Sequence, residues 1–114
     1  MRKILVYDKK KYFLIYIKKK FYKEFILEKK SLPKMDNYIY SNVYCCIVFV
    51  AYHEEDVVPF LDYLALSLPI IVCSENKALL NMYGNIPEII CVDIGLDKQE
   101  SYKLLETNIK LKVG

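Results

Sequence analysis

The chain has few of the residues that form ligand-binding loops. It contains three glycines in 114 residues, Gly84, Gly95 and Gly114, and none of them follows the first strand-like segment. A loop that holds a phosphate or a flavin needs glycine there, because its backbone N–H groups must approach the ligand closely. This scarcity argues against a nucleotide or flavin site.

Histidine, tryptophan and paired cysteine motifs are also scarce. The chain has no tryptophan, no CxxC spacing and one histidine, His53, which we interpret as an exposed loop residue because no nucleophile or second metal ligand accompanies it. Thiols within apolar runs are typical of buried, reduced strand residues, and they argue against a zinc site or a secreted disulfide scaffold. Four cysteines have this setting: Cys45, Cys46, Cys73 and Cys91.

Long uncharged segments are absent as well. The longest stretch without a formal charge, 37–53, contains polar residues and is too short to span a bilayer. The net charge of +3 comes from short lysine clusters such as 9–11 and 18–20, which we interpret as solvated surface. Because the first strand-like segment begins at Lys3, we expect no signal peptide. We therefore expect residues 1–114 to form a single cytoplasmic domain that binds neither nucleic acid nor membrane.

Four continuous apolar runs predict the strands of a parallel sheet. They cover 3–7, 45–50, 69–73 and 88–93. An alternating pattern marks a strand with one solvated face, whereas a continuous run marks a strand that is covered on both faces. Helices are therefore expected on both sides of the sheet.

Three other stretches carry helix signals, each combining a start signal with apolar residues at helical spacing. Acidic residues at 54–56 suit a helix N-terminus, and Pro59 in the first turn costs little because its missing N–H would be unpaired there. The first stretch has Phe60, Leu64 and Ser67 at helical spacing, with Leu61 and Leu68 alongside. The second covers 77–83, with Asn76 as its N-terminal cap and Gly84 as its stop. The third has an Asp97–Glu100 capping box before Tyr102, Leu105 and Ile109.

The N-terminal segment allows two interpretations. Tyrosine and isoleucine favour a hairpin, whereas Phe13, Ile17 and Phe21 share one helical face. We prefer a helix at about 10–22 and a strand at 24–27, because consecutive parallel strands need a crossover. Any second helix within 31–43 is expected to be short or irregular. The order of elements then predicts an α/β (βα)5 domain with a five-stranded parallel sheet.

Four stretches match a known family in order and spacing: KILVYDKK at 3–10, CIVFVAY at 46–52, LPIIVCSE at 68–75 and IICVDI at 89–94. Together they resemble the first, third, fourth and fifth strands of the receiver domains of bacterial two-component response regulators. The similarity extends over nearly the whole chain. It implies a flavodoxin-like fold with strand order 2-1-3-4-5.

The same resemblance implies a phosphorylation site that this chain has largely lost. Receivers accept a phosphoryl group on an aspartate after the third strand, with two acids for Mg²⁺, a hydroxyl after the fourth strand and a lysine after the fifth. Here Asp8 matches the first acid and Ser74 matches the hydroxyl. Lys9 replaces the second acid, Ala51 replaces the acceptor and Asp93 replaces the lysine. We refer to these five residues as the relic pocket.

Several interpretations of these residues remain open. Asp8 and Ser74 can each cap a following helix instead of serving a site, and Lys9 can pair with Asp93 across the top of the sheet. A shifted alignment would make one of the acids at 54–56 the acceptor. We do not favour this shift, because those residues follow the buried strand by too many positions to lie at its end.

We therefore expect a phosphorylation-independent, receiver-like signalling module that is not an enzyme, needs no cofactor or metal, and binds a protein partner or a second copy. The resemblance implies an interface on the fourth helix, fifth strand and fifth helix, with candidates Tyr83, Tyr102, Lys103 and Leu104. The alternative is a small flavodoxin-like ligand-binding protein or enzyme that uses the crevice at the carboxyl ends of the strands. Nucleic-acid binding through the lysine clusters lacks a recognisable reading helix.

Overall fold

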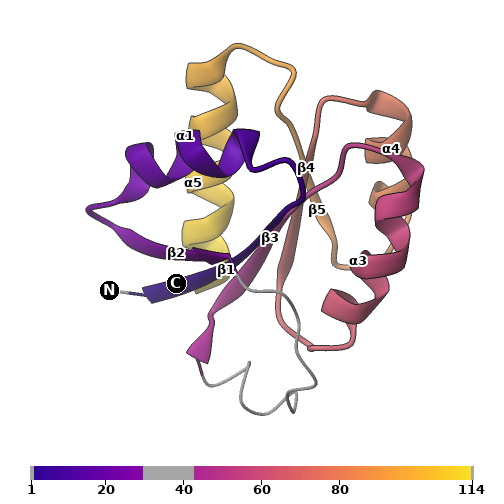
Figure 1. Ribbon diagram of the computed structural model, residues 1–114, viewed down its shortest axis with the longest axis horizontal. Coiled ribbons are helices and arrows are strands. Elements are labelled where there is room, and N and C mark those ends of the chain that lie inside the picture. Colours follow the sequence, from indigo (N-terminus) through magenta and orange to yellow (C-terminus); the bar gives the residue numbers. More distant parts are fainter. Residues whose placement is uncertain (1, 30–42, 114) are drawn as a thin grey trace.

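A five-stranded parallel sheet forms the centre of the protein. The computed structural model describes residues 2–29 and 43–113. The strand order is β2-β1-β3-β4-β5, and every neighbouring pair is parallel (Figure 1). This arrangement confirms the predicted α/β, flavodoxin-like topology. The strands are β1 (Arg2–Asp8), β2 (Phe25–Lys29), β3 (Cys46–Val50), β4 (Ile70–Ser74) and β5 (Ile90–Asp93).

The strands coincide with the continuous apolar runs. All five residues of β3 and all five of β4 are buried, as expected for strands with helices on both faces. The last strand is shorter than predicted and begins at Ile90 instead of residue 88. Glu88 has a φ of 69°, a left-handed conformation that belongs to a turn and is incompatible with a strand.

The segment after β1 is a helix, as preferred, and the hairpin alternative is wrong. Helix α1 (Tyr12–Phe21) leads directly into β2. Its buried residues are Leu14, Ile17 and Phe21, whereas the predicted Phe13 is only partly buried. Spacing of three and then four residues keeps a stripe parallel to the helix axis, which explains why Leu14 faces the sheet instead of Phe13.

The next helix buries a different face from the predicted one. A 3₁₀ turn, η1 (Glu54–Asp56), precedes α3 (Val57–Leu64), which buries Phe60 and Tyr63. Leu64 is 39% exposed, and Ser67 lies beyond the helix end with a φ of 59°. The predicted stripe of Phe60, Leu64 and Ser67 is therefore wrong, because the helix stops before residue 67 and turns Tyr63 toward the sheet.

The last two helices begin as expected. Asn76 caps α4 (Lys77–Gly84), since its Oδ1 accepts hydrogen bonds from the backbone N–H groups of Ala78 (2.9 Å) and Leu79 (3.2 Å). Helix α5 (Lys98–Val113) follows β5. Its buried residues are Ser101, Leu105 and Ile109, with Tyr102 partly buried beside them.

The sheet separates two hydrophobic layers. Helices α1 and α5 cover one face, and α3 and α4 cover the other (Figure 1). The second layer is rich in aromatic pairs, including the stacked Tyr7–Phe49 pair at 4.5 Å and the edge-to-face Phe60–Tyr83 pair at 4.7 Å between ring centroids.

The expected irregular second helix at 31–43 falls, except for Val43, outside the described residues. Within the described ranges, no helix is both long enough and apolar enough to cross a membrane.

Candidate functional site

The relic pocket lies where the carboxyl ends of the strands meet. Asp8 and Ser74 are the last residues of β1 and β4, Asp93 ends β5, Ala51 directly follows β3 and Lys9 directly follows β1. In the sheet register, Asp8 lies opposite Val50, and Ser74 lies opposite Asp93. The five predicted residues therefore share one edge of the sheet.

Asp8 is fully buried and accepts three hydrogen bonds from within the chain. Its Oδ1 accepts hydrogen bonds from the N–H of Lys11 (2.9 Å) and the hydroxyl of Tyr52 (2.5 Å). Its Oδ2 accepts one from the N–H of Leu14 (2.8 Å). Asp8 thus caps α1 and is covered by a tyrosine ring. Asp8 was expected either to cap the following helix or to serve a site, and its hydrogen bonds are those of a cap.

Tyr52 occupies the space above Asp8. Its hydroxyl donates to Asp8, and burial together with this neighbouring carboxylate raises the pKa of Tyr52 well above that of a free tyrosine. The phenol therefore stays neutral and remains a donor at physiological pH. The ammonium of Lys10 lies 5.0 Å from the centre of the same ring.

The position that the receiver resemblance assigns to the acceptor has no side-chain oxygen. Ala51 is buried, and its carbonyl accepts a hydrogen bond from the Ser74 hydroxyl (2.8 Å). The Ser74 oxygen in turn accepts one from the N–H of Asn76 (3.1 Å). Ser74 therefore links β3 to the turn before α4. The cavity above these residues, about 270 Å³, is lined by Ala51, Tyr52, Ser74, Glu75, Asn76 and Ile94.

The expected ion pair between Lys9 and Asp93 is wrong. Both residues are described, and no ion pair joins them. Asp93 Oδ1 instead accepts a hydrogen bond from the N–H of Gly95 (2.8 Å), while Lys9 is exposed. A Cβ added at Gly95 would lie 3.1 Å from the same carboxylate oxygen, so glycine suits this close turn.

Sequence reasoning missed the structural role of Asp56. This carboxylate is 2% exposed and accepts hydrogen bonds from the N–H groups of Tyr52 (2.8 Å) and His53 (3.0 Å) and from the Tyr7 hydroxyl (3.3 Å). It fixes the loop that carries Tyr52. The spacing between His53 and Asp56, which form a capping box, is the sequence signal that could have indicated this role. His53 itself is exposed, as expected.

The predicted interface residues do not form one exposed set. Tyr83 is fully buried against Phe60, and its hydroxyl has no hydrogen-bond partner among the described residues. Its inclusion in a surface was wrong, because the residue faces the sheet from α4. Tyr102 is half-buried and packs toward Phe13, whereas Lys103 and Leu104 are exposed.

The cysteines also differ from the expected uniform burial. Cys46 and Cys73 are buried, whereas Cys45 and Cys91 are half-buried, and all four are free thiols. A hydrogen bond with Cys46, helped by nearby Arg2, lowers the pKa of Cys45 to about 7 and raises that of Cys46. The neutral Cys45 thiol can instead donate to the Lys3 carbonyl (3.2 Å), which opposes this shift.

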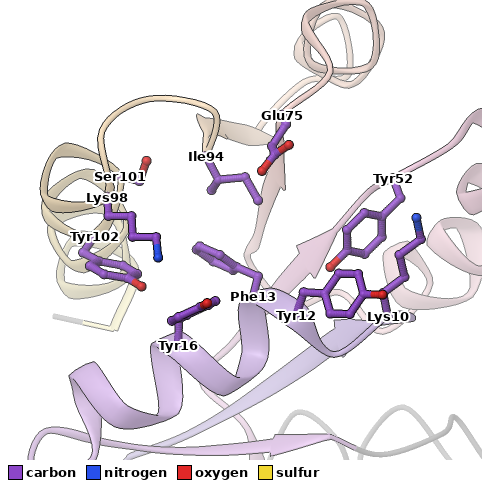
Figure 2. Close-up of a pocket in the computed structure, with 10 residues that line it drawn as sticks. All are labelled: Lys10, Tyr12, Phe13, Tyr16, Tyr52, Glu75, Ile94, Lys98, Ser101 and Tyr102. Carbon is purple, nitrogen blue, oxygen red and sulfur yellow. The ribbon is translucent and has the colours of Figure 1, made fainter.

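An aromatic cleft of about 340 Å³ opens beside the relic pocket, between α1 and α5 (Figure 2). Sequence reasoning did not identify it, because its walls come from four segments that meet only in the fold. Five of the ten residues are aromatic, and three are charged. The cleft is lined by Lys10, Tyr12, Phe13, Tyr16, Tyr52, Glu75, Ile94, Lys98, Ser101 and Tyr102.

A second exposed apolar surface lies on the other side of the molecule. Val58 and Leu61 project from α3 with exposures of 67% and 58%, and Met82 of α4 is also exposed. These side chains lie on the outward faces of two helices that pack on the same side of the sheet. Single exposed apolar side chains are common on monomers, and a contact surface is indicated where they form a contiguous patch.

The described part of the chain contains no group of three or more histidine, cysteine, aspartate or glutamate residues that could hold a metal ion. No family model matches this chain, and neither a curated protein nor a solved structure shows significant similarity to it.

Proposed function

We propose that this protein is a receiver-like signalling module that acts by binding another protein and does not depend on phosphorylation. The observation that carries the proposal is the state of Asp8, which is fully buried and accepts three hydrogen bonds from within the chain. A carboxylate engaged in this way has no oxygen directed at solvent for Mg²⁺, which needs ligands in near-octahedral geometry.

The surroundings of Asp8 support the same proposal. Ala51 provides no side-chain oxygen for a phosphoryl group, and the Ser74 hydroxyl is held by the Ala51 carbonyl. The end of β5 is Asp93 and not a lysine, and this aspartate accepts a hydrogen bond from the N–H of Gly95 in its own turn. Transfer to a carboxylate would place added negative charge beside Asp8 and Asp93, and the end of β5 supplies no lysine to pair with it.

Protein binding needs exposed apolar side chains, and two surfaces offer them. On α5, Leu104 is 44% exposed beside Lys103, within the face that receivers use for partners. On the opposite side of the sheet, Val58 and Leu61 of α3 are more exposed still. A partner or a second copy of the chain would remove these apolar groups from water.

The experiment is sedimentation velocity of the purified protein with and without beryllofluoride and Mg²⁺. We expect the same distribution of species in both conditions, because no acceptor is present. If the protein self-associates through α5, Leu104→Glu should dissociate it, whereas Leu61→Glu on α3, an exposed leucine on the opposite side of the sheet, serves as the matched control. A change of oligomeric state on adding beryllofluoride would contradict the proposal.

A second candidate function is ligand binding at the carboxyl ends of the strands. The aromatic cleft favours it, because the cleft lies beside β1 and β3, where the strand order of the sheet reverses. Open parallel sheets commonly bind ligands at this point. The two functions are compatible, since a bound small molecule can modify a protein-binding module.

A further inference from the structure

We infer that the aromatic cleft binds a small planar aromatic carboxylate whose ring also carries a hydrogen-bond donor. The inference rests on the second candidate function above and is independent of any protein partner. It is carried by the shape of the cleft and by the placement of its three charged groups.

The dimensions of the cleft suit a small molecule. Its volume of about 340 Å³ lies at the lower end of the range for ligand pockets, which extends from roughly 300 to 1,000 Å³. Its walls come from α1, from α5 and from the loops after β3 and β4. A polyphosphate-bearing nucleotide would need a glycine-rich loop, and the turn after β1 contains lysines instead.

The side chains that line the cleft favour a ligand with a flat, aromatic group. Phe13 lies in the middle of the cleft, with Tyr16 and Tyr102 to one side of it and Tyr52 to the other (Figure 2). Phe13 and Tyr102 approach to 6.3 Å between ring centroids. The hydrogen bond from Tyr52 to Asp8 fixes the opposite wall. Rings that are already held in place accept another ring at little cost in side-chain entropy.

Lys98 supplies the positive charge. Its ammonium lies 4.2 Å from the centre of the Tyr16 ring, and among the described residues no carboxylate pairs with it. Figure 2 shows the Lys98 ammonium extending over the cleft toward Phe13, whereas the Lys10 ammonium points away beyond Tyr52. A ligand carboxylate can replace the ring as the partner of Lys98, because a charge-assisted hydrogen bond is stronger than an exposed cation–π contact.

Glu75 determines the rest of the ligand. Its side chain enters from the loop after β4, next to Ile94, and within the described ranges it has no hydrogen bond or ion pair. Of the two lysines that line the cleft, only Lys98 extends its ammonium over it, and Glu75 adds a negative charge, so a ligand with one negative charge is favoured over one with two. The free carboxylate is an acceptor for a hydroxyl or N–H on the ring.

The test is a titration of the ¹⁵N-labelled full chain with 4-hydroxybenzoate, followed by amide NMR. We expect saturable shifts at residues 13, 16, 98 and 102. The neutral 4-hydroxybenzamide and the non-aromatic 4-hydroxycyclohexanecarboxylate should each bind at least about tenfold more weakly. Equal binding of the amide would remove Lys98 from the recognition, and the absence of saturable shifts at millimolar ligand would overturn the inference.

Variants make the assignment specific. Lys98→Met should weaken 4-hydroxybenzoate binding by at least about tenfold, whereas Lys18→Met, an exposed lysine of α1 outside the cleft, should change it less than twofold. Glu75→Gln should reduce the preference for 4-hydroxybenzoate over benzoate. Unchanged binding in Lys98→Met would show adventitious association only and would contradict the inference. Failure here leaves the beryllofluoride result unaffected, so the two proposals fail separately.

Discussion

Replacing Asp8 by alanine should lower stability substantially, because this carboxylate is a structural cap. The substitution removes the acceptor for the N–H of Lys11, which directly precedes α1, for the N–H of Leu14 in the first turn of α1, and for the Tyr52 hydroxyl. Loss of an N-cap costs about 1 kcal/mol, and a hydrogen bond to a buried charged group contributes about 1.5–3 kcal/mol. Water can reach part of the exposed helix terminus, so we expect a total loss of about 3 kcal/mol.

The measurement is urea unfolding followed by circular dichroism, with thermal unfolding as a second readout. For a domain of about this length, 3 kcal/mol corresponds to a fall of roughly 12 °C in the melting temperature. Asp8→Asn keeps one carbonyl oxygen and should lose about half as much. Asp62→Ala, an exposed aspartate on α3, is the control and should change the unfolding free energy by less than about 0.5 kcal/mol.

The opposite result would refute the capping role. An acid that is held ready for metal or phosphoryl chemistry is commonly kept at a cost in stability, so its removal stabilises the protein. If Asp8→Ala were as stable as the unsubstituted chain, or more stable, the hydrogen bonds of Asp8 would not support the fold and the pocket would have to be reconsidered as functional.

Three further predictions concern residues around the core and the relic pocket. Tyr83→Phe should raise the unfolding free energy by about 1 kcal/mol, because it removes a buried hydroxyl that has no partner among the described residues; a loss of stability in urea unfolding would contradict this. Cys45 should be the first thiol to react with iodoacetamide in the native protein. Its reaction rate should rise through about pH 7, because the neighbouring thiol lowers the pKa of Cys45. Peptide mass spectrometry that finds another cysteine modified first would be inconsistent with this prediction. A double-mutant cycle of Lys9→Ala and Asp93→Ala should give a coupling energy below about 0.3 kcal/mol, and coupling above about 1 kcal/mol would reveal an ion pair.

The sheet could be predicted from the sequence because strand burial leaves a direct signal. Continuous apolar runs identified four strands, and the need for a crossover favoured a helix before β2. The boundaries were less predictable. Glu88 adopts a left-handed turn within an apolar run, and the end of α3 turns Ser67 away from the sheet. The local pattern of apolar and polar residues indicates neither feature.

The candidate site could be predicted only where it depends on strand ends. Residues such as Asp8 and Ala51 follow directly from the alignment of the strands. The cover provided by Tyr52 depends on how Asp56 folds its loop, and the aromatic cleft depends on how α1 and α5 pack. Tyr83 was misplaced because tyrosine is common both in interfaces and in cores, so its identity alone does not indicate exposure.

We propose that this protein acts without phosphoryl transfer, and intact-mass spectrometry detects such a transfer as an added mass. The native protein is incubated with acetyl phosphate and Mg²⁺, and the mass is compared with that of an untreated sample. We expect no increase, because Ala51 has no side-chain oxygen and Asp8 is enclosed. A stoichiometric increase by one phosphoryl group, labile to base and mapped to an aspartate at the carboxyl end of the sheet, would contradict the claim.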